Sequence, residues 1–407
     1  MADIKQQKRI AGSTAYTIGA GLLMNGVLQI FIYPYLNRHM GSEMLGSLLF
    51  IMGIAAIVCP SIGQALNTSR LVVRRTAGVV NGDYDRMLLL FGSIGGVISL
   101  VIGRSSIGSP VEAVIIFVLI LLMVFRFYGD VEYRLNLNYR KYFTYYAVLT
   151  GGYLAGFGLF FLTGMWHLIF LTGEVLALIY LAVTGTVFSD FLSPSRWFST
   201  AFRRGIFLMF SYVITNVTLN IDRLVLKFLI SDLAVTQYYA VSLLGKTLVL
   251  LVAPINTIII SFLTKRKEDL TKVQYLKFVG AGYGVSLVFF IGAQIFTPIF
   301  LRLFYGNLYE SVRPVIGIVN ASQVLGVLSA YLFIVVLTFT EEKWQMILQI
   351  LHLAVITALV LSVTGKYGLI GFSTAVLIAN AARAVIVTLF GLFMVGRKKN
   401  GNQSAPA

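Results

Sequence analysis

The feature that most constrains this chain is a series of long apolar runs separated by short polar segments. The runs cover residues 11–36, 44–66, 87–104, 111–129, 142–163, 166–188, 205–229, 233–263, 276–301, 313–339, 345–364 and 368–395. A membrane-spanning helix needs about 20 mostly apolar residues, so each run is long enough to cross a bilayer. Barrel strands are only about 10 residues long and alternate apolar with polar side chains, which these runs do not. We therefore expect an all-α integral membrane protein with about twelve transmembrane helices.

The composition explains why these runs do not form the core of a soluble protein. Of the 407 residues, 58% are hydrophobic and only 12% are charged. A soluble domain is about one quarter charged, because charged side chains keep its surface in contact with water. No polar stretch here is long enough to form a separate soluble domain. Membrane lipids are therefore the expected surroundings of almost the whole chain.

The basic residues predict how the helices are oriented. The formal charge is +16, and most of the 32 Lys and Arg residues gather in short clusters between the runs. With the N-terminus in the cytoplasm, 22 of them fall in inner segments, six in outer segments and four within runs. Inner loops of membrane proteins are enriched in Lys and Arg, so this bias supports the count of twelve and two cytoplasmic termini. Because orientation accounts for the charge, no nucleic-acid partner is expected.

The chain is predicted to divide into two halves of six helices. We expect an N-terminal bundle at 1–190, a cytoplasmic linker at 191–204, a C-terminal bundle at 205–395 and a cytoplasmic tail at 396–407. A weak internal echo supports this division, because a base followed by Ser and an acid comes after helix one and again after helix seven. Halves with an even number of helices point the same way, and such parallel bundles are typical of transporters.

Three basic residues lie inside apolar runs. Lys246 is near the middle of the eighth run, Arg383 is near the middle of the last, and Arg223 is in the seventh. A charge at the centre of a span costs about 3 kcal/mol on insertion scales, so it usually faces a cavity or a partner. We expect a water-filled, positively charged cavity suited to an anionic group such as pyrophosphate. The alternative for Arg223, and the preferred interpretation of Arg126, is that the side chain reaches toward the headgroups.

Polar stripes accompany these bases. In the seventh run, Tyr212, Asn216, Asn220, Arg223 and Lys227 recur at helical spacing and share one face. In the first run, the polar residues are likewise spaced four apart. The predicted substrate-binding residues are Lys246, Arg223, Arg383, Asn216, Asn220, Asn25 and Gln29.

Acidic residues within the runs are few. Glu174 lies in the sixth run and Asp222 in the seventh. Glu174 either binds a coupling proton or sodium ion or pairs with an intramembrane base, and pairing is the preferred interpretation. Asp222 precedes Arg223 directly, and adjacent residues on a helix do not face each other, so these two are not expected to neutralise one another.

Motifs for catalysis, metals or cofactors fail in this sequence. Residues 245–247 end like a phosphate-binding loop, but Ala240 stands where the first glycine is required and no strand precedes it. The three histidines are far apart and lack the spacing of metal ligands. His352 is interpreted as a polar packing residue. No cofactor, no metal and no enzymatic activity are expected, and no ATP would be bound by this chain.

Four segments, in order along the chain, carry a family resemblance. They are residues 34–46, 220–226, 298–309 and 366–375, which read PYLNRHMGSEMLG, NIDRLVL, PIFLRLFYGNLY and KYGLIGFSTA. Together they resemble Wzx-type flippases of O-antigen or capsule repeat units, which form the polysaccharide-export branch of the multidrug/oligosaccharidyl-lipid/polysaccharide superfamily. They correspond to the family's first outer loop, its seventh-helix signature, the loop after helix nine and the loop into helix twelve. The first loop departs from the family pattern at His39 and Met40, where leucines are commoner.

The resemblance implies two six-helix bundles around a central cavity and transport by alternating access. The implied cargo is an undecaprenyl-diphosphate-linked oligosaccharide, moved from the inner to the outer leaflet of a bacterial inner membrane. Cationic cavity residues would hold the pyrophosphate, and an ion gradient would drive the cycle. The expected partners are this lipid-linked cargo, membrane lipids, and the polymerase and chain-length proteins of polysaccharide assembly.

Three alternatives remain open at this point. A drug/cation antiporter of the same superfamily would bind cations, yet the clear intramembrane charges here are basic. A polysaccharide polymerase or ligase would need a catalytic cluster and a large outer loop, and the chain has neither. A non-transporting scaffold predicts that Lys246→Ala has no effect.

Overall fold

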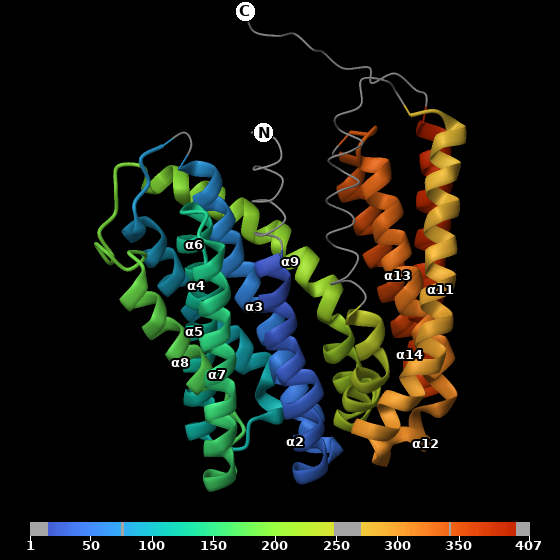
Figure 1. The fold of residues 1–407 in the computed structure, drawn as a ribbon, viewed down its shortest axis with the longest axis horizontal. Coiled ribbons are helices and arrows are strands. Elements are labelled where there is room, and N and C mark those ends of the chain that lie inside the picture. Colours follow the sequence, from blue (N-terminus) through green and yellow to red (C-terminus); the bar gives the residue numbers. More distant parts are fainter. Residues whose placement is uncertain (1–14, 75–76, 248–269, 342, 396–407) are drawn as a thin grey trace, which may run out of the picture. The chain divides into compact units, whose positions relative to one another are not determined.

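The computed structural model describes residues 15–74, 77–247, 270–341 and 343–395, and these form helices joined by turns, without a strand among them (Figure 1). Ten helices in this described part are long and apolar enough to cross a membrane, and the last, Ile347–Met394, holds two segments separated by a kink. The prediction of an all-helical, multi-pass membrane protein is confirmed. The count of twelve stays a prediction, because most of the run 233–263 lies outside the described residues.

Contacts group the chain into two compact units, Met1–Lys227 and Phe228–Ala407, called here the N-terminal and C-terminal units. Most of α9 therefore groups with the N-terminal unit. The cytoplasmic linker at residues 191–204, between two bundles of six helices, stays a prediction.

The N-terminal unit is an all-helical bundle that begins with a composite first helix. Residues 15–26 are α-helical, the next turn is a π-helix, and α2 continues it with Pro34 in its first turn. The elements are η1 (Val27–Ile32), α2 (Tyr33–Met40), α3 (Ser42–Val73), α4 (Asn81–Gly103), η2 (Arg104–Ser106), α5 (Pro110–Gly129), α6 (Val131–Leu135), α7 (Tyr139–Thr163), α8 (His167–Thr184) and α9 (Phe198–Leu229).

The C-terminal unit contains a helix over residues 232–247 and a bundle of long helices. These elements are α11 (Lys272–Phe304), η3 (Gly306–Leu308), α12 (Tyr309–Val312), η4 (Arg313–Val315), α13 (Ile316–Leu337) and α14 (Lys343–Met394). The backbone of α14 breaks at Gly368, where φ is 55° and ψ is −139°. A residue with a Cβ atom rarely adopts this conformation, so glycine at this position lets the chain turn between the two segments.

Local sequence signals explain several helix boundaries. Ser109 and Asn138 each accept a hydrogen bond, 3.2 Å long, from a backbone N–H in the first turn of the helix that follows. Thr271 and Gln274 cap the start of α11 reciprocally. Gly164 ends α7 at a φ of 70°. Each device satisfies a backbone group that the end of a helix would otherwise leave without a partner.

Glycines let neighbouring helices of the N-terminal unit approach closely. Gly152 of α7 lies against Gly173 of α8, and Gly156 lies against the α8 backbone. Gly96 of α4 makes room for the ring of Phe117 on α5. Small residues at such contacts are typical of helix packing in membranes. Lipid tails are as apolar as the helices, so helices associate through close packing rather than through the hydrophobic effect.

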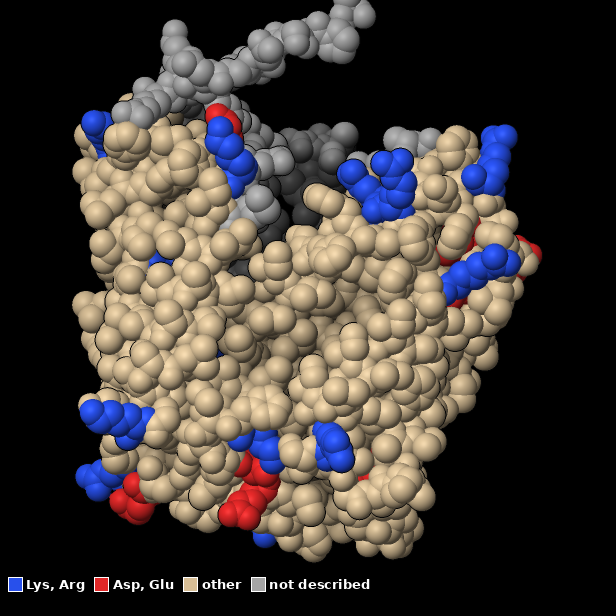
Figure 2. Space-filling model, turned by 180° about the vertical axis from the view of Figure 1, so that it is seen from behind, with Lys and Arg blue, Asp and Glu red and all other residues tan. Residues whose placement is uncertain are grey.

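Large apolar side chains remain exposed on the surfaces of the helices. Leu162 is 82% exposed, Val183 80% and Phe210 70%. Figure 2 shows a face on which Lys and Arg lie mostly near the upper and lower edges, with a broad zone between them that shows almost no charge. Exposed apolar surface on this scale is unfavourable in water and favourable against lipid tails.

Candidate functional site

Lys246 lies near the described end of the helix formed by residues 232–247. Its ammonium group is 5.9 Å from the centroid of the Tyr238 ring. The Tyr238 hydroxyl accepts a hydrogen bond of 3.3 Å from the Gln323 amide of α13. Gly245 packs directly against the Gln323 side chain. Lys246 is therefore placed at a close contact between its own helix and α13, inside the C-terminal unit.

The polar stripe of α9 lies along α3. Tyr212 and Thr68 share a hydrogen bond of 2.9 Å between their hydroxyl groups. The Asn216 amide donates to the Ser61 hydroxyl at 3.0 Å. Asn220 donates to the backbone carbonyl of Asn216 at 3.1 Å. Part of this stripe is thus used in holding α9 against α3.

Arg223 and Lys227 continue the stripe toward the end of α9. The aliphatic part of Arg223 lies against Gly53 of α3, where an added Cβ would be 2.8 Å from the arginine Cδ. The Lys227 ammonium group is 5.8 Å from the ring centroid of Phe50. Asp222 lies beside Arg223 on the same helix. The roles of Arg223 and Asp222 in binding stay predictions.

The first helix carries a second short polar stripe. Asn25 donates to the backbone carbonyl of Gly21 at 2.9 Å, and Gln29 donates to the Asn25 side-chain oxygen at 3.3 Å. Tyr33, one step further, is buried. The predicted spacing therefore corresponds to a real chain of side-chain contacts within one helix, while its role toward a substrate stays a prediction.

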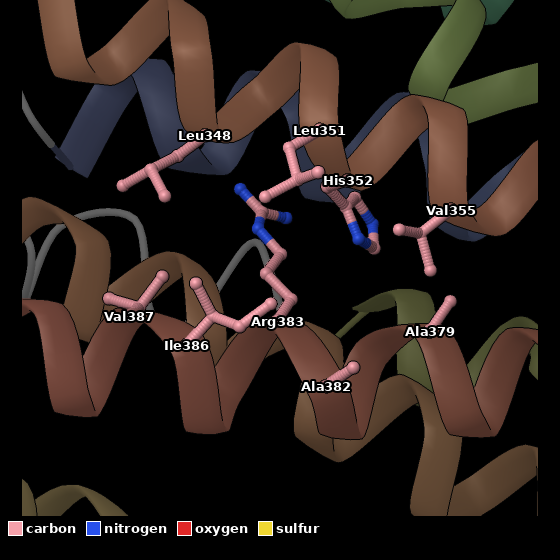
Figure 3. A pocket seen from close by; sticks show the side chains of 9 residues that line it. All are labelled: Leu348, Leu351, His352, Val355, Ala379, Ala382, Arg383, Ile386 and Val387. Carbon is pink, nitrogen blue, oxygen red and sulfur yellow. The ribbon is translucent and has the colours of Figure 1, made fainter.

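Arg383 points into a small pocket between the two segments of α14, where it faces His352 (Figure 3). Its guanidinium carbon is 5.9 Å from the centroid of the Phe333 ring on α13. One turn earlier, Asn380 donates to the Ser322 carbonyl at 3.0 Å and so ties this segment to α13. Arg383 and Lys246 both belong to the C-terminal unit, whereas Arg223 belongs to the N-terminal unit.

Glu174 is fully buried and is held by two side chains. The Arg126 Nε donates to both of its carboxylate oxygens, at 3.0 and 2.8 Å, and the Tyr153 hydroxyl donates at 3.1 Å. The preferred interpretation of Glu174, pairing with an intramembrane base, agrees with this geometry. The interpretation of Arg126 as a headgroup-seeking residue is wrong, because its side chain is only 4% exposed and turns inward to the carboxylate.

Asp130 is the centre of a polar network that sequence reasoning missed. It accepts hydrogen bonds from Asn67 of α3 at 2.5 Å and from Tyr146 of α7 at 3.2 Å, and it pairs with Arg134 at 3.1 Å. It lies just after the fourth apolar run, where a carboxylate is ordinarily interpreted as part of a solvated loop. The several tyrosines early in the fifth run could have indicated this network, because buried tyrosine hydroxyls need hydrogen-bond partners.

The segment before α9 is attached to the start of α4. The Asp83 carboxylate accepts hydrogen bonds of 2.7 Å from both the backbone and the hydroxyl of Ser195. Arg86 donates to the Leu192 carbonyl at 2.8 Å, and Gly82 packs against the Ser193 backbone. The predicted linker is therefore held by the N-terminal unit at several points.

A scan against protein-family models and a search of curated proteins find no match to the sequence. Solved structures do match. One is the lipid II flippase MurJ in an inward closed conformation, with a TM-score of 0.65 at 12% identity, covering 96% of this chain and 87% of that chain. Another is a multidrug resistance MATE family transporter of the MOP superfamily in its inward-facing conformation, with a TM-score of 0.61 at 17% identity over 94% of each chain.

The outward-facing conformation of a multidrug resistance MATE family transporter also matches, with a TM-score of 0.55 at 15% identity over 95% of each chain. The likeness therefore extends over nearly the whole chain, and its low identity establishes the fold alone. The solved structures that share this fold are transporters and a flippase. Together with its apolar helices, this makes the chain a multi-pass membrane protein that shares its fold with these solved structures.

Proposed function

We propose that this protein is a flippase for undecaprenyl-diphosphate-linked oligosaccharide repeat units. It moves them from the inner to the outer leaflet of the bacterial inner membrane by alternating access, with both termini in the cytoplasm. Its product feeds the polymerase and chain-length proteins of surface polysaccharide assembly. The ordered Wzx-like segments of the sequence support this branch of the superfamily.

The observation that carries the proposal is which charged side chains within the described helices have a partner of opposite charge. Glu174 is enclosed by Arg126 and Tyr153, so its carboxylate is not presented to a cationic substrate. Arg383, in contrast, has no acidic partner within the described part of the chain. A base of this kind within an apolar helix is stabilised by an anion, which favours a diphosphate over an organic cation.

The proposed binding roles follow from these positions. Lys246, Arg383 and Arg223 are the proposed contacts of the diphosphate. The amides of Asn25, Gln29, Asn216 and Asn220 are the proposed polar contacts of the substrate. Asn216 would have to exchange its bond to Ser61 for one to the substrate.

The similar solved structures favour two candidate functions, a flippase and a drug/cation antiporter. MurJ is described as a lipid II flippase, and its likeness favours a lipid-linked cargo. The MATE structures are of multidrug resistance transporters, and their likeness favours a drug/cation antiporter as the second candidate. The enclosure of Glu174 counts against that second candidate, because a cation needs an accessible counter-charge.

Complementation in a bacterium that lacks its own repeat-unit flippase tests the proposal. The host must make the matching repeat unit, and surface polysaccharide and membrane levels of the protein are scored together. We expect wild type to restore the polymer, and Lys246→Ala and Arg383→Ala to lose most of it at equal protein levels. His39→Gln, at an exposed position, is the matched control and should behave as wild type.

Three results would separate the candidates. If wild type restores the polymer and the Lys246 and Arg383 variants match it, the flippase assignment stands and the assigned site is wrong. If a well-expressed wild type fails with a matched repeat unit but confers resistance to organic cations, the antiporter is correct. If a labelled lipid-linked unit is chemically altered rather than relocated, the protein is an enzyme.

A further inference from the structure

The pocket between the two segments of α14 is lined by two basic side chains and several aliphatic ones. Figure 3 shows that Arg383 from the second segment and His352 from the first enter it from opposite sides and lie next to each other. The other lining side chains are aliphatic, and no acidic residue is among the described residues that line it. Two basic groups therefore share one apolar pocket.

These two side chains are not satisfied by protein groups. Neither His352 nor Arg383 forms a hydrogen bond or an ion pair within the described residues. The nearest electron-rich group is the Phe333 ring, 5.9 Å from the guanidinium carbon. His352 is only 7% exposed. Buried polar groups normally have partners, which points to a ligand at this position.

The position of the pocket along the membrane-spanning helices is a second reason to expect an anionic ligand. His352 follows the start of α14 at Lys343 by nine residues, which is roughly 14 Å along a helix. Arg383 lies 15 residues beyond the kink at Gly368, or roughly 22 Å. The hydrocarbon core is about 30 Å thick, so both bases lie at membrane depth rather than at a headgroup layer. A guanidinium group there is strongly stabilised by an anion.

The size and opening of the pocket restrict the ligand. Its volume is about 20 Å³, which holds about one water molecule or one oxygen of a larger anion. Leu351 and Ile386, which also line it, are 44% and 36% exposed, so the pocket opens at the surface of the C-terminal unit. A larger molecule can therefore insert one oxygen while the rest of it stays outside.

We propose that this pocket is a phosphate subsite, in which Arg383 and His352 both donate hydrogen bonds to one phosphate oxygen. An imidazole offers at least one N–H donor in either protonation state, and a guanidinium offers several. The occupant is the diphosphate of the lipid-linked cargo, so this assignment rests on the proposed function. It gives His352 a substrate contact in place of the packing role expected from the sequence.

Equilibrium binding of radiolabelled farnesyl diphosphate to the purified full-length protein tests this subsite. Farnesyl diphosphate carries the diphosphate and a short prenyl chain but no sugar. We expect saturable binding by wild type, and binding at least roughly tenfold weaker in both His352→Phe and Arg383→Leu, which have no side-chain donor and so lose a charge-assisted hydrogen bond to the phosphate. His39→Phe should bind as wild type does, and uncharged farnesol should not compete.

His352→Phe is the decisive variant, because it keeps the size of the ring but removes the N–H donor, and only the subsite predicts that this change weakens diphosphate binding. Equal binding by His352→Phe and wild type overturns the subsite, as does absence of phosphate-dependent binding by a folded wild type. Competition by phosphatidylglycerol as strong as that by unlabelled farnesyl diphosphate assigns the pocket to a lipid headgroup and overturns the diphosphate. Competition by inorganic pyrophosphate at similar concentration supports recognition of the diphosphate alone.

The subsite and the proposed function can fail separately. If wild type complements a flippase-deficient host but His352→Phe binds farnesyl diphosphate normally, the function stands and the subsite is wrong. If His352→Phe weakens binding while wild type fails to complement with a matched repeat unit, the subsite stands and the cargo assignment is wrong.

Discussion

The position of Arg223 depends on the absence of a side chain at residue 53. Gly53 of α3 leaves room for the arginine stem, and an added Cβ would lie 2.8 Å from its Cδ. We predict that Gly53→Ala displaces Arg223 and lowers polysaccharide export severalfold, with little change in protein level. Gly158→Ala is the matched control, because nothing lies within 4 Å of a Cβ there. Export by Gly53→Ala equal to that of the control would show that the placement of Arg223 is unimportant.

The buried pair of Arg126 and Glu174 is predicted to contribute to stability rather than to ion coupling. Removing one member of a buried pair leaves the other charge uncompensated, at a cost of about 3–5 kcal/mol. Glu174→Ala should therefore lower the thermal unfolding midpoint strongly in detergent, and Arg126→Leu combined with Glu174→Leu should recover much of the loss. A Glu174→Ala protein that is stable but inactive in transport would instead assign the carboxylate to coupling.

Sequence reasoning at the residue scale identified charges but could not assign their partners. Lys246, Arg383 and Glu174 stood out because a charge in an apolar run is rare. That Arg126 turns inward depends on where α5 and α8 meet, and these helices are 48 residues apart in sequence at the contact. The presence of His352 and Arg383 in one pocket likewise depends on how the two segments of α14 pack.

At the scale of elements, the kink of α14 provides a sharp test of backbone strain. Gly368 has a φ of 55° and a ψ of −139°, a region that residues with a Cβ atom avoid. We predict that Gly368→Ala destabilises the protein by about 1–3 kcal/mol. Gly365→Ala, in the same segment but with an ordinary φ and open space, should be neutral or slightly stabilising. Thermal unfolding of both variants in detergent gives the comparison, and equal midpoints would contradict the assigned conformation.

The positions of the helices in the sequence were predicted far better than the contacts between them. The apolar runs correspond closely to the described spans, because length and hydropathy are properties of the local sequence. The contact of α9 with α3 was not foreseen. The stripe from Tyr212 to Lys227 was interpreted as the wall of a cavity, since a polar helix face in a membrane fits either a cavity or a neighbouring polar helix.

At the scale of the whole molecule, the orientation in the membrane is still a prediction from the basic residues. Cys59 is the single cysteine and is buried, so cysteines introduced elsewhere can be labelled selectively. In intact cells, a membrane-impermeant maleimide should label Ser105→Cys, in a predicted outer segment, and should not label Ser199→Cys, in a predicted inner one. Both positions are exposed. The reverse pattern would place the termini outside.

The measurement that tests the central claim most directly is translocation of a labelled lipid in vesicles that contain only this protein. Purified wild type, Lys246→Ala, Arg383→Ala and His39→Gln are reconstituted with the fluorescent, sugar-bearing undecaprenyl diphosphate of a matching host, and its arrival in the opposite leaflet is followed by quenching. The account predicts translocation by wild type and by His39→Gln, at least roughly tenfold slower translocation by the other two variants, and no transfer of an organic cation. Equal rates with and without wild type, or transport of the cation alone, would contradict it.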